Sequence, residues 1–183
     1  LATVRQFLPA LADWQIGGRL SGEVTAEKSP QGTDVRLDVS FVDGRFADTE
    51  GVHAGDKLSG DLKLVARGRE KQWQWRNELS WAAGELYLAP IYLASPGMTL
   101  TSAGTIDGDR LDLDTLEVAS DSFGRLSIKG VADLDDKKIR SASFATGEVQ
   151  LDRFAPAFLA PLLESIAGPK LNWSGRFAAA GEV

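Results

Sequence analysis

The chain of 183 residues has no cysteine and only one histidine, and these absences narrow its chemistry. Without cysteine it forms no disulfide and offers no thiolate to a metal ion. The single histidine, His53, excludes a histidine-based metal site and a catalytic triad supported by a second histidine. His53 stands in Gly-Val-His-Ala-Gly, which is typical of a loop. A phosphate-binding glycine loop and a nucleophile elbow are also missing, and we predict that the protein is not an enzyme.

Long hydrophobic runs and excess positive charge are lacking as well. No apolar stretch approaches the roughly 20 residues that span a bilayer, and we expect no signal peptide within these residues. The net charge of −6 provides no basic surface for nucleic acid or for anionic lipid headgroups. We therefore expect no nucleic-acid partner. The chain starts at Leu1 and not at Met, from which we expect an excised segment whose targeting and anchoring parts lie outside it.

The sequence is instead rich in alternating apolar and polar residues, the pattern of a half-buried strand. It is clearest where Val35, Leu37, Val39 and Phe41 alternate with polar residues, and it recurs along most of the chain. The phase slips at Asp114-Thr115, which indicates a bulge, and Asp43-Gly44 indicates a hairpin or a bulge. The predicted fold class is mainly β: an antiparallel meander forming a curved, rolled sheet, either a groove or an open sandwich, with one short C-terminal helix.

Two further patterns concern repetition. The motif Leu-Ser-Gly-x-apolar occurs at 20–24 and 58–62 and returns as Trp-Ser-Gly-Arg-Phe at 173–177. Glycine weakens a strand, so its recurrence suggests a sheet bend or the close approach of a backbone or an aromatic ring. The segment 151–183 also repeats the order of residues in 4–27, pairing Trp14 with Trp173 and Gly22 with Gly175. We expect one period of a longer array: an apolar lead-in at 1–15, a β meander at 16–151, a helix at 152–168 (its centre Ala155–Ala167), and a strand at 169–183 that begins the next repeat.

The Leu-Ser-Gly strands at 20–24 and 58–62, the strand at 126–130 and the 152–177 block together resemble the AsmA-like group, which includes the TamB, YhdP and YdbH proteins. The resemblance covers essentially the whole chain. It implies a periplasmic protein of Gram-negative bacteria, anchored to the inner membrane in its full length, with a long sheet curled into a trough. It also implies a role in phospholipid transport between the membranes and in outer-membrane biogenesis, with the ligand's acyl chains held on the apolar sheet face.

The candidate residues follow from that reading. The lipid groove would be lined by apolar residues of four strands: Leu20, Val24, Val35, Leu37, Val39, Phe41, Leu62, Leu64, Trp73 and Trp75. The helix would plug the trough with Phe154, Phe158, Leu162, Leu163 and Ile166. Partners would be a phospholipid or another acyl-chain ligand and, through segments outside this chain, the membrane. Exposed sheet edges would also permit self-association.

Alternatives remain open at this stage. Trp73, Trp75 and Trp81 share one strand face, where they would line a groove, stack on sugar rings or simply fill a core. The second hypothesis is accordingly a β-sandwich that binds carbohydrate or mediates adhesion, and the third is a passive envelope scaffold. Asn77 lies on the same face and needs a hydrogen-bond partner there.

Acidic turns raise the question of a metal or cofactor. Asp107, Asp109, Asp112 and Asp114 form one cluster, and Asp133, Asp135 and Asp136 form another. Both lack the calcium-loop spacing with its distal Glu, and aspartate in tight turns is explained by turn chemistry. We therefore predict no metal site and no cofactor.

Overall fold

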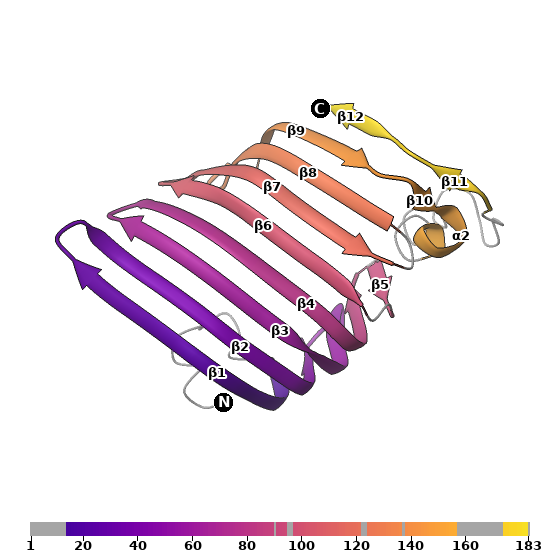
Figure 1. The fold of residues 1–183 in the computed structure, drawn as a ribbon, viewed down its shortest axis with the longest axis horizontal. Coiled ribbons are helices and arrows are strands. Elements are labelled where there is room, and N and C mark those ends of the chain that lie inside the picture. The colour runs from indigo at the N-terminus through magenta and orange to yellow at the C-terminus, as the bar shows by residue number, and fades with distance from the viewer. Residues whose placement is uncertain are drawn as a thin grey trace.

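The computed structural model describes residues 14–89, 91–94, 97–121, 124–136, 138–156 and 174–182. These residues form one large antiparallel sheet, a small two-stranded sheet and one short helix (Figure 1). The large sheet has the order β1-β2-β3-β4-β6-β7-β8-β9-β12, with β5 paired to β4. Its strands are β1 Gln15–Ser29, β2 Gly32–Ala47, β3 His53–Arg69, β4 Gln72–Leu88, β5 Ile91–Leu93, β6 Met98–Asp107, β7 Arg110–Ser120, β8 Gly124–Asp133, β9 Lys138–Thr146 and β12 Ala180–Glu182. The small sheet pairs β10 Val149–Gln150 with β11 Arg176–Phe177, and the helix is α2 Leu151–Phe154.

The predicted fold class is confirmed. The molecule is mainly β, each strand of the large sheet pairs antiparallel with its neighbours, and the sheet does not close on itself. Its two edges are β1 and β12, which lie at opposite sides of the ribbon in Figure 1. The described residues supply no second sheet over either of its faces apart from the short β10–β11 pair.

Register divides the sheet into two faces, since side chains alternate along each strand and residues paired across strands point the same way. Leu37 of β2 pairs with Val24 of β1 and with Leu64 of β3. The face that carries these three residues is called the apolar face below. Their neighbours in sequence, such as Arg36 and Lys63, belong to the opposite face, called the charged face.

The sheet bends along a line that crosses its four longest strands, visible in Figure 1 as the curled ends of β1–β4. Pairing is irregular between Gly17 and Arg19, between Phe41 and Gly44, and between Asp56 and Ser59. Positive φ angles mark the same line at Gly18 (110°), Asp43 (51°), Lys57 (51°) and Gly84 (107°). Bulges increase local twist and curvature, so their alignment folds the strand ends over together.

The core cluster found among the described residues lies at this end of the sheet. It unites Trp81, Leu93 and Met98 with Val149 and with Phe154 of α2. The Phe154 ring meets Phe177 of β11 edge to face, with 5.7 Å between ring centroids. The small β10–β11 sheet and α2 therefore cover one end of the large sheet.

Local predictions had mixed outcomes. Of the two alternatives for Asp43-Gly44, the bulge is confirmed: the strand around Val39 continues to Ala47, and the turn follows at 48–52. His53 is not a loop residue but the first residue of β3. The bulge at Asp114-Thr115 is confirmed by the register shift of β7 against β8.

The predicted C-terminal helix is seen only at its start. The helix begins at Leu151, one residue before the predicted start at 152. Ala155 is the residue that directly follows α2. Residues 157–173 lie outside the described part, and so do the lead-in at 1–13 and Trp173. The C-terminal segment contributes β11 and β12, and β12 adds to the large sheet by pairing with β9.

Candidate functional site

The apolar face is the most extensive chemical feature of the described structure. One row of cross-strand neighbours runs from Gly22 through Val39, Leu62, Leu79, Leu100 and Val118 to Leu126. The next row runs from Val24 through Leu37, Leu64, Asn77, Ser102, Leu116 and Ile128 to Phe144. The face is therefore continuous across the sheet, from the edge strand β1 to β9.

The predicted groove residues all lie on this face. Leu20 of β1 pairs with Phe41 of β2. Leu37 of β2 lies between Val24 of β1 and Leu64 of β3, and Val39 lies in the same way between Gly22 and Leu62. Val35 pairs with Ala66, which pairs in turn with Trp75, and Trp73 is two residues away. The prediction stopped at β4 and missed the continuation on β6–β8, which includes Leu100, Leu116, Val118 and Ile128. The same period-two alternation in those strands could have revealed it.

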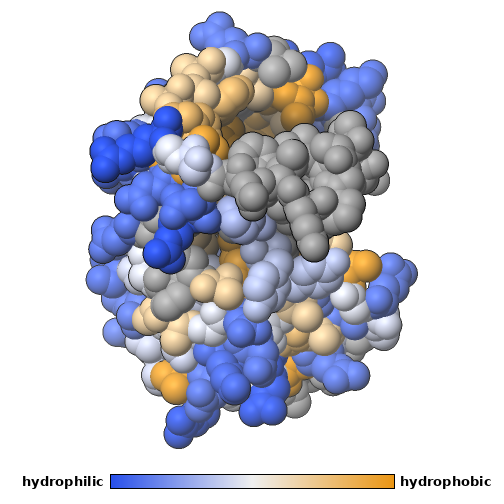
Figure 2. Space-filling model, turned by 90° about the vertical axis from the view of Figure 1, so that its right-hand side faces the viewer, coloured by the Kyte–Doolittle hydropathy of each residue, from blue (hydrophilic) through white to orange (hydrophobic). Residues whose placement is uncertain are grey.

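Most of the apolar face is only half covered. Val39 is buried at 6% exposure, but Leu37, Leu62 and Leu64 remain half-buried. Exposure is greatest toward the sides of the sheet, at 71% for Leu20 in β1 and 72% for Ile139 in β9. Seen from the side of β12 and α2, hydrophobic residues gather in the upper half between hydrophilic borders (Figure 2). The face therefore leaves apolar surface in contact with solvent.

Aromatic rings lie flat over glycines on the strand next to them. Phe41 pairs with Gly60, Trp73 with Gly68, Trp75 with Gly104 and Phe144 with Gly181. A Cβ atom added to Gly104 would lie 2.5 Å from Cη2 of Trp75, and one added to Gly181 would lie 2.7 Å from a ring carbon of Phe144. The rings, together with a backbone carbonyl oxygen of the other neighbouring strand at Gly60 and Gly104, occupy the space that a side chain would fill, which explains these in-strand glycines.

A polar cluster interrupts the apolar face near its centre. The indole N–H of Trp75 donates to Oγ of Ser102 at 3.1 Å, and Ser102 donates to Oδ1 of Asn77. Asn77 and Ser102 are directly paired across β4 and β6. Asn77 therefore has the partner that a polar residue on this face requires, and nothing in the sequence pattern pointed to Ser102, 25 residues away.

The end of the apolar face is covered by the core around Trp81 and Phe154. Phe154 is 6% exposed and packs with Met98 and Val149. Of the five predicted plug residues only Phe154 is described; Phe158, Leu162, Leu163 and Ile166 lie outside the described residues.

The charged face is held by exposed ion pairs. Nε of Arg67 lies 2.5 Å from Oδ1 of Asp34 on the paired strand. Arg110 binds Asp112 through both Nε and Nη2, and this bond is the main reason that the pKa of Asp112 is lowered. Exposed pairs contribute little stability, so their main effect is to keep this face hydrated.

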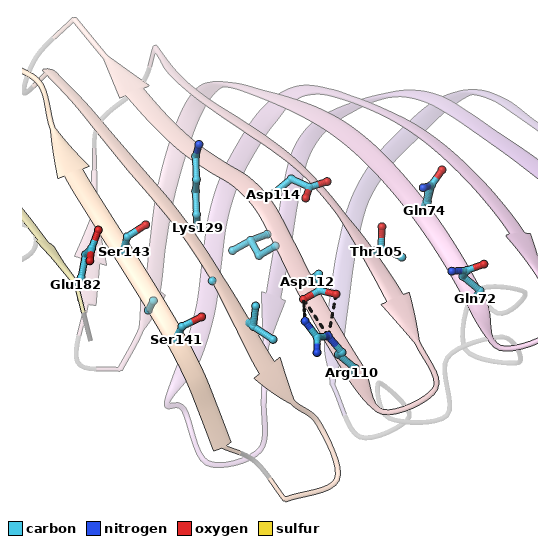
Figure 3. Close-up of a pocket in the computed structure, with 14 residues that line it drawn as sticks. Gln72, Gln74, Thr105, Arg110, Asp112, Asp114, Lys129, Ser141, Ser143 and Glu182 are labelled. Carbon is cyan, nitrogen blue, oxygen red and sulfur yellow. Dashed lines mark hydrogen bonds and ion pairs between the residues drawn. The ribbon is translucent and has the colours of Figure 1, made fainter.

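A polar hollow of about 850 Å³ lies on the charged face between β4 and β12 (Figure 3). Its lining is hydrophilic and contains no aromatic side chain among the described residues. The residues labelled in Figure 3 are Gln72, Gln74, Thr105, Arg110, Asp112, Asp114, Lys129, Ser141, Ser143 and Glu182. Arg110 and Asp112 pair with each other in the lining, which also carries the charged side chains of Asp114, Lys129 and Glu182.

His53 belongs to a small aromatic and acidic cluster beyond the bend. Its Nδ1 lies 2.6 Å from Oδ2 of Asp48, and its ring stacks on Trp14 with centroids 6.0 Å apart. Burial of the Asp48 carboxyl opposes ionisation, but hydrogen bonds from His53 and from backbone N–H groups outweigh it, and the pKa of Asp48 is lowered. This arrangement fastens the 48–53 turn.

Within the described ranges, no group of three or more His, Cys, Asp or Glu residues is placed to hold a metal ion. Asp133, from one acidic turn, instead accepts a hydrogen bond from the backbone of Asp136 and pairs with Arg140 at 2.9 Å. Among the described helical residues, none forms a segment with the length and apolarity needed to traverse a bilayer.

Comparison with known proteins adds no relative. No family model matches the sequence, no curated protein matches it, and no solved structure matches the fold.

Proposed function

We propose that this chain is a segment of a periplasmic protein that carries phospholipid between membranes, and that its apolar face holds the acyl chains. In the full-length protein, anchoring to the inner membrane would come from segments outside this chain. The observation that carries the proposal is a single-layer sheet whose apolar face runs across eight strands, from Leu20 and Val24 in β1 to Phe144 in β9, with no second layer over it in the described residues.

The physical support is that an apolar sheet face needs a cover. Removing apolar surface from water yields about 25 cal/mol per Å², and the half-buried Leu37, Leu62 and Leu64 leave part of that stabilisation unrealised. In a sandwich a second sheet provides the cover. Here hydrocarbon would provide it, because the opposite face is charged and faces water.

The dimensions of the face suit acyl chains. The eight strands that carry the face leave seven intervals, which at about 4.8 Å each span about 34 Å. The acyl chains of one bilayer leaflet span about 15 Å. Aromatic rings lying over glycines make this surface smooth, which favours contact with a flexible chain. The resemblance of the sequence to the AsmA-like group supports the same function and the periplasmic location.

The carbohydrate hypothesis fits the arrangement less well. It predicted tryptophans on an outer face among polar neighbours, whereas Trp73, Trp75 and Trp81 share the face of Leu64 and Leu79, and Trp81 is 5% exposed. The polar hollow on the opposite face lacks an aromatic platform for a sugar ring in its described lining. A passive scaffold remains the competing hypothesis, and it predicts that no lipid is bound.

Mass spectrometry of lipids that co-purify with the chain tests the proposal. We expect phospholipid with the wild type and little with the double variant Leu37→Asp/Val39→Asp, which places two charges on the apolar face. The matched control is Thr25→Asp/Val65→Asp, in which the two new carboxylates flank Arg36 on the charged face. It should retain lipid. Absence of lipid from the wild type, or equal loss in both folded variants, would contradict the proposal.

A further inference from the structure

We infer that Asn77, supported by Ser102 and Trp75, binds an uncharged carbonyl oxygen of the ligand, so that the ligand class is an acyl ester whose ester group lies on the apolar face. This inference rests on the proposed function, and it adds where the polar part of the ligand binds.

The cluster lies at the middle of the apolar face, away from both edges. Asn77 is on β4 and Ser102 on β6, the fourth and fifth strands of the nine-strand path. In their row, Leu64 flanks Asn77 on one side and Leu116 flanks Ser102 on the other. Asn77 and Ser102 are half-buried, so a ligand can still reach them.

Counting donors and acceptors shows what the cluster needs. Trp75 contributes one N–H, Ser102 one O–H and Asn77 two N–H groups. The two internal hydrogen bonds, from Trp75 to Ser102 and from Ser102 to Asn77, use two of these four donors. With the amide oxygen toward Ser102, both N–H donors of Asn77 remain, and the oxygens of Ser102 and Asn77 each keep one acceptor site. Turning the amide round would commit one of these N–H donors to Ser102 and release the Ser102 O–H, so in either orientation the cluster keeps two donors for an acceptor on the ligand.

The surroundings determine which acceptor fits. The cross-strand neighbours on the same face, Leu64 and Leu116, are apolar, and so is Leu79, two residues along β4. The charged Arg76 and Glu78 adjoin Asn77 in sequence but point to the other face, as alternation requires. A phosphate or carboxylate placed here would lose its hydration without gaining a cation, which is costly. An uncharged carbonyl needs only the donors that Asn77 provides.

An ester carbonyl is the acceptor that an acyl lipid carries at the head of its chain. With its oxygen at Asn77, the chain would extend over the leucines and valines of the neighbouring rows. The indole of Trp75, which lies over Gly104, would border the ester group. The geometry thus makes Asn77 the residue that selects an acyl ester over a plain hydrocarbon or an ether.

The experiment compares two probes of equal chain length, decanoyl glycerol, which is an ester, and decyl glycerol, which is the corresponding ether without a carbonyl. Binding to the 183-residue chain is measured by isothermal titration calorimetry. One hydrogen bond of ordinary net strength gives a preference of about three- to tenfold for the ester. In Asn77→Leu the ester preference should disappear, while affinity for the ether stays within about twofold.

The outcomes separate this inference from the proposed function. Equal affinity of the wild type for ester and ether would overturn the role of Asn77 and leave the acyl-chain surface standing. An ester preference that persists in Asn77→Leu would also overturn it. Failure of both probes to bind would overturn the inference together with the proposed function. The wild-type comparison is decisive even if the variant does not fold.

Discussion

At single positions, the glycines of the apolar face are best understood through the rings that lie over them. Gly60, Gly68, Gly104 and Gly181 each sit directly opposite Phe or Trp on the paired strand. A side chain at these positions would displace the ring and roughen the surface. The in-strand glycines are therefore a packing requirement, which the sequence motif suggested without naming the partner rings.

Replacing Gly104 by alanine tests this packing. The new Cβ would lie 2.5 Å from Cη2 of the Trp75 ring and 2.4 Å from the backbone carbonyl oxygen of Asp112 in β7. Overpacking of this kind costs about 1–3 kcal/mol. Gly147→Ala is the matched control, since its nearest neighbour would be 3.8 Å away. Urea unfolding should show a lower free energy of unfolding for Gly104→Ala only; equal stability of the two variants would contradict the packing account.

The lowered pKa of Asp48 predicts a pH dependence of stability. The carboxylate is stabilised in the folded state, so its contribution is present above the unfolded pKa of about 3.8 and is lost as the pH falls through the lower folded value. Asp112 and Asp133, whose pKa values are also lowered, act in the same direction. In Asp48→Asn the thermal midpoint should fall less steeply than in wild type between pH 5 and pH 3, a range set by about one unit either side of that value. Identical slopes would exclude a role for the Asp48–His53 contact.

At the scale of elements, the bend across β1–β4 depends on backbone conformations with positive φ, and these positions differ in whether they tolerate a residue with a Cβ atom. Gly84 has φ of 107°, and a Cβ there would lie 2.6 Å from backbone atoms of Leu58. Lys57 has φ of 51°, the left-handed region that disfavours residues with a Cβ by about 1–2 kcal/mol. The bend therefore needs glycine at one of these positions and merely accepts lysine at the other.

Two substitutions distinguish these positions. Gly84→Ala should lower the free energy of unfolding by more than about 1 kcal/mol, because alanine fits neither the φ angle nor the space. Lys57→Gly should stay within about 1 kcal/mol of wild type, since relief of left-handed strain offsets the added freedom of the unfolded chain. Chemical denaturation measures both. A Gly84→Ala variant as stable as Lys57→Gly would show that the bend across β1–β4 does not require glycine at position 84.

The alternation of apolar and polar residues allowed most strands to be predicted, because a half-buried strand exposes every second side chain to solvent. The sequence did not decide whether Asp43-Gly44 is a hairpin turn or a bulge, since the composition fits both, and strand pairing shows the bulge. The partner of Asn77 could not be predicted either, because Ser102 reaches it only through strand pairing. Whether the sheet is open or closed depends on long-range pairing of this kind, and only the structure decided it.

At the scale of the whole molecule, the edge strands β1 and β12 pair with one neighbour each, and no described residue adds a further strand beside them. β1 offers 15 residues of edge with Leu20 and Val24 exposed beside it, and such edges are templates for strand addition. We predict concentration-dependent self-association in analytical ultracentrifugation. Leu20→Lys/Val24→Lys should weaken it by charge repulsion, whereas a dimer that persists in this variant would place the contact elsewhere.

The central claim is that lipid lies on one face of the sheet, and adjacent residues of β3 test it most directly. Leu64 is on the apolar face and Val65, 53% exposed, is on the charged face. A photo-crosslinking amino acid is placed at one position or the other, and the attachment of phospholipid to the chain after irradiation in the cell envelope is measured. We predict crosslinked phospholipid at position 64 and little at position 65. Equal crosslinking at the two positions, or none at position 64, would contradict the account.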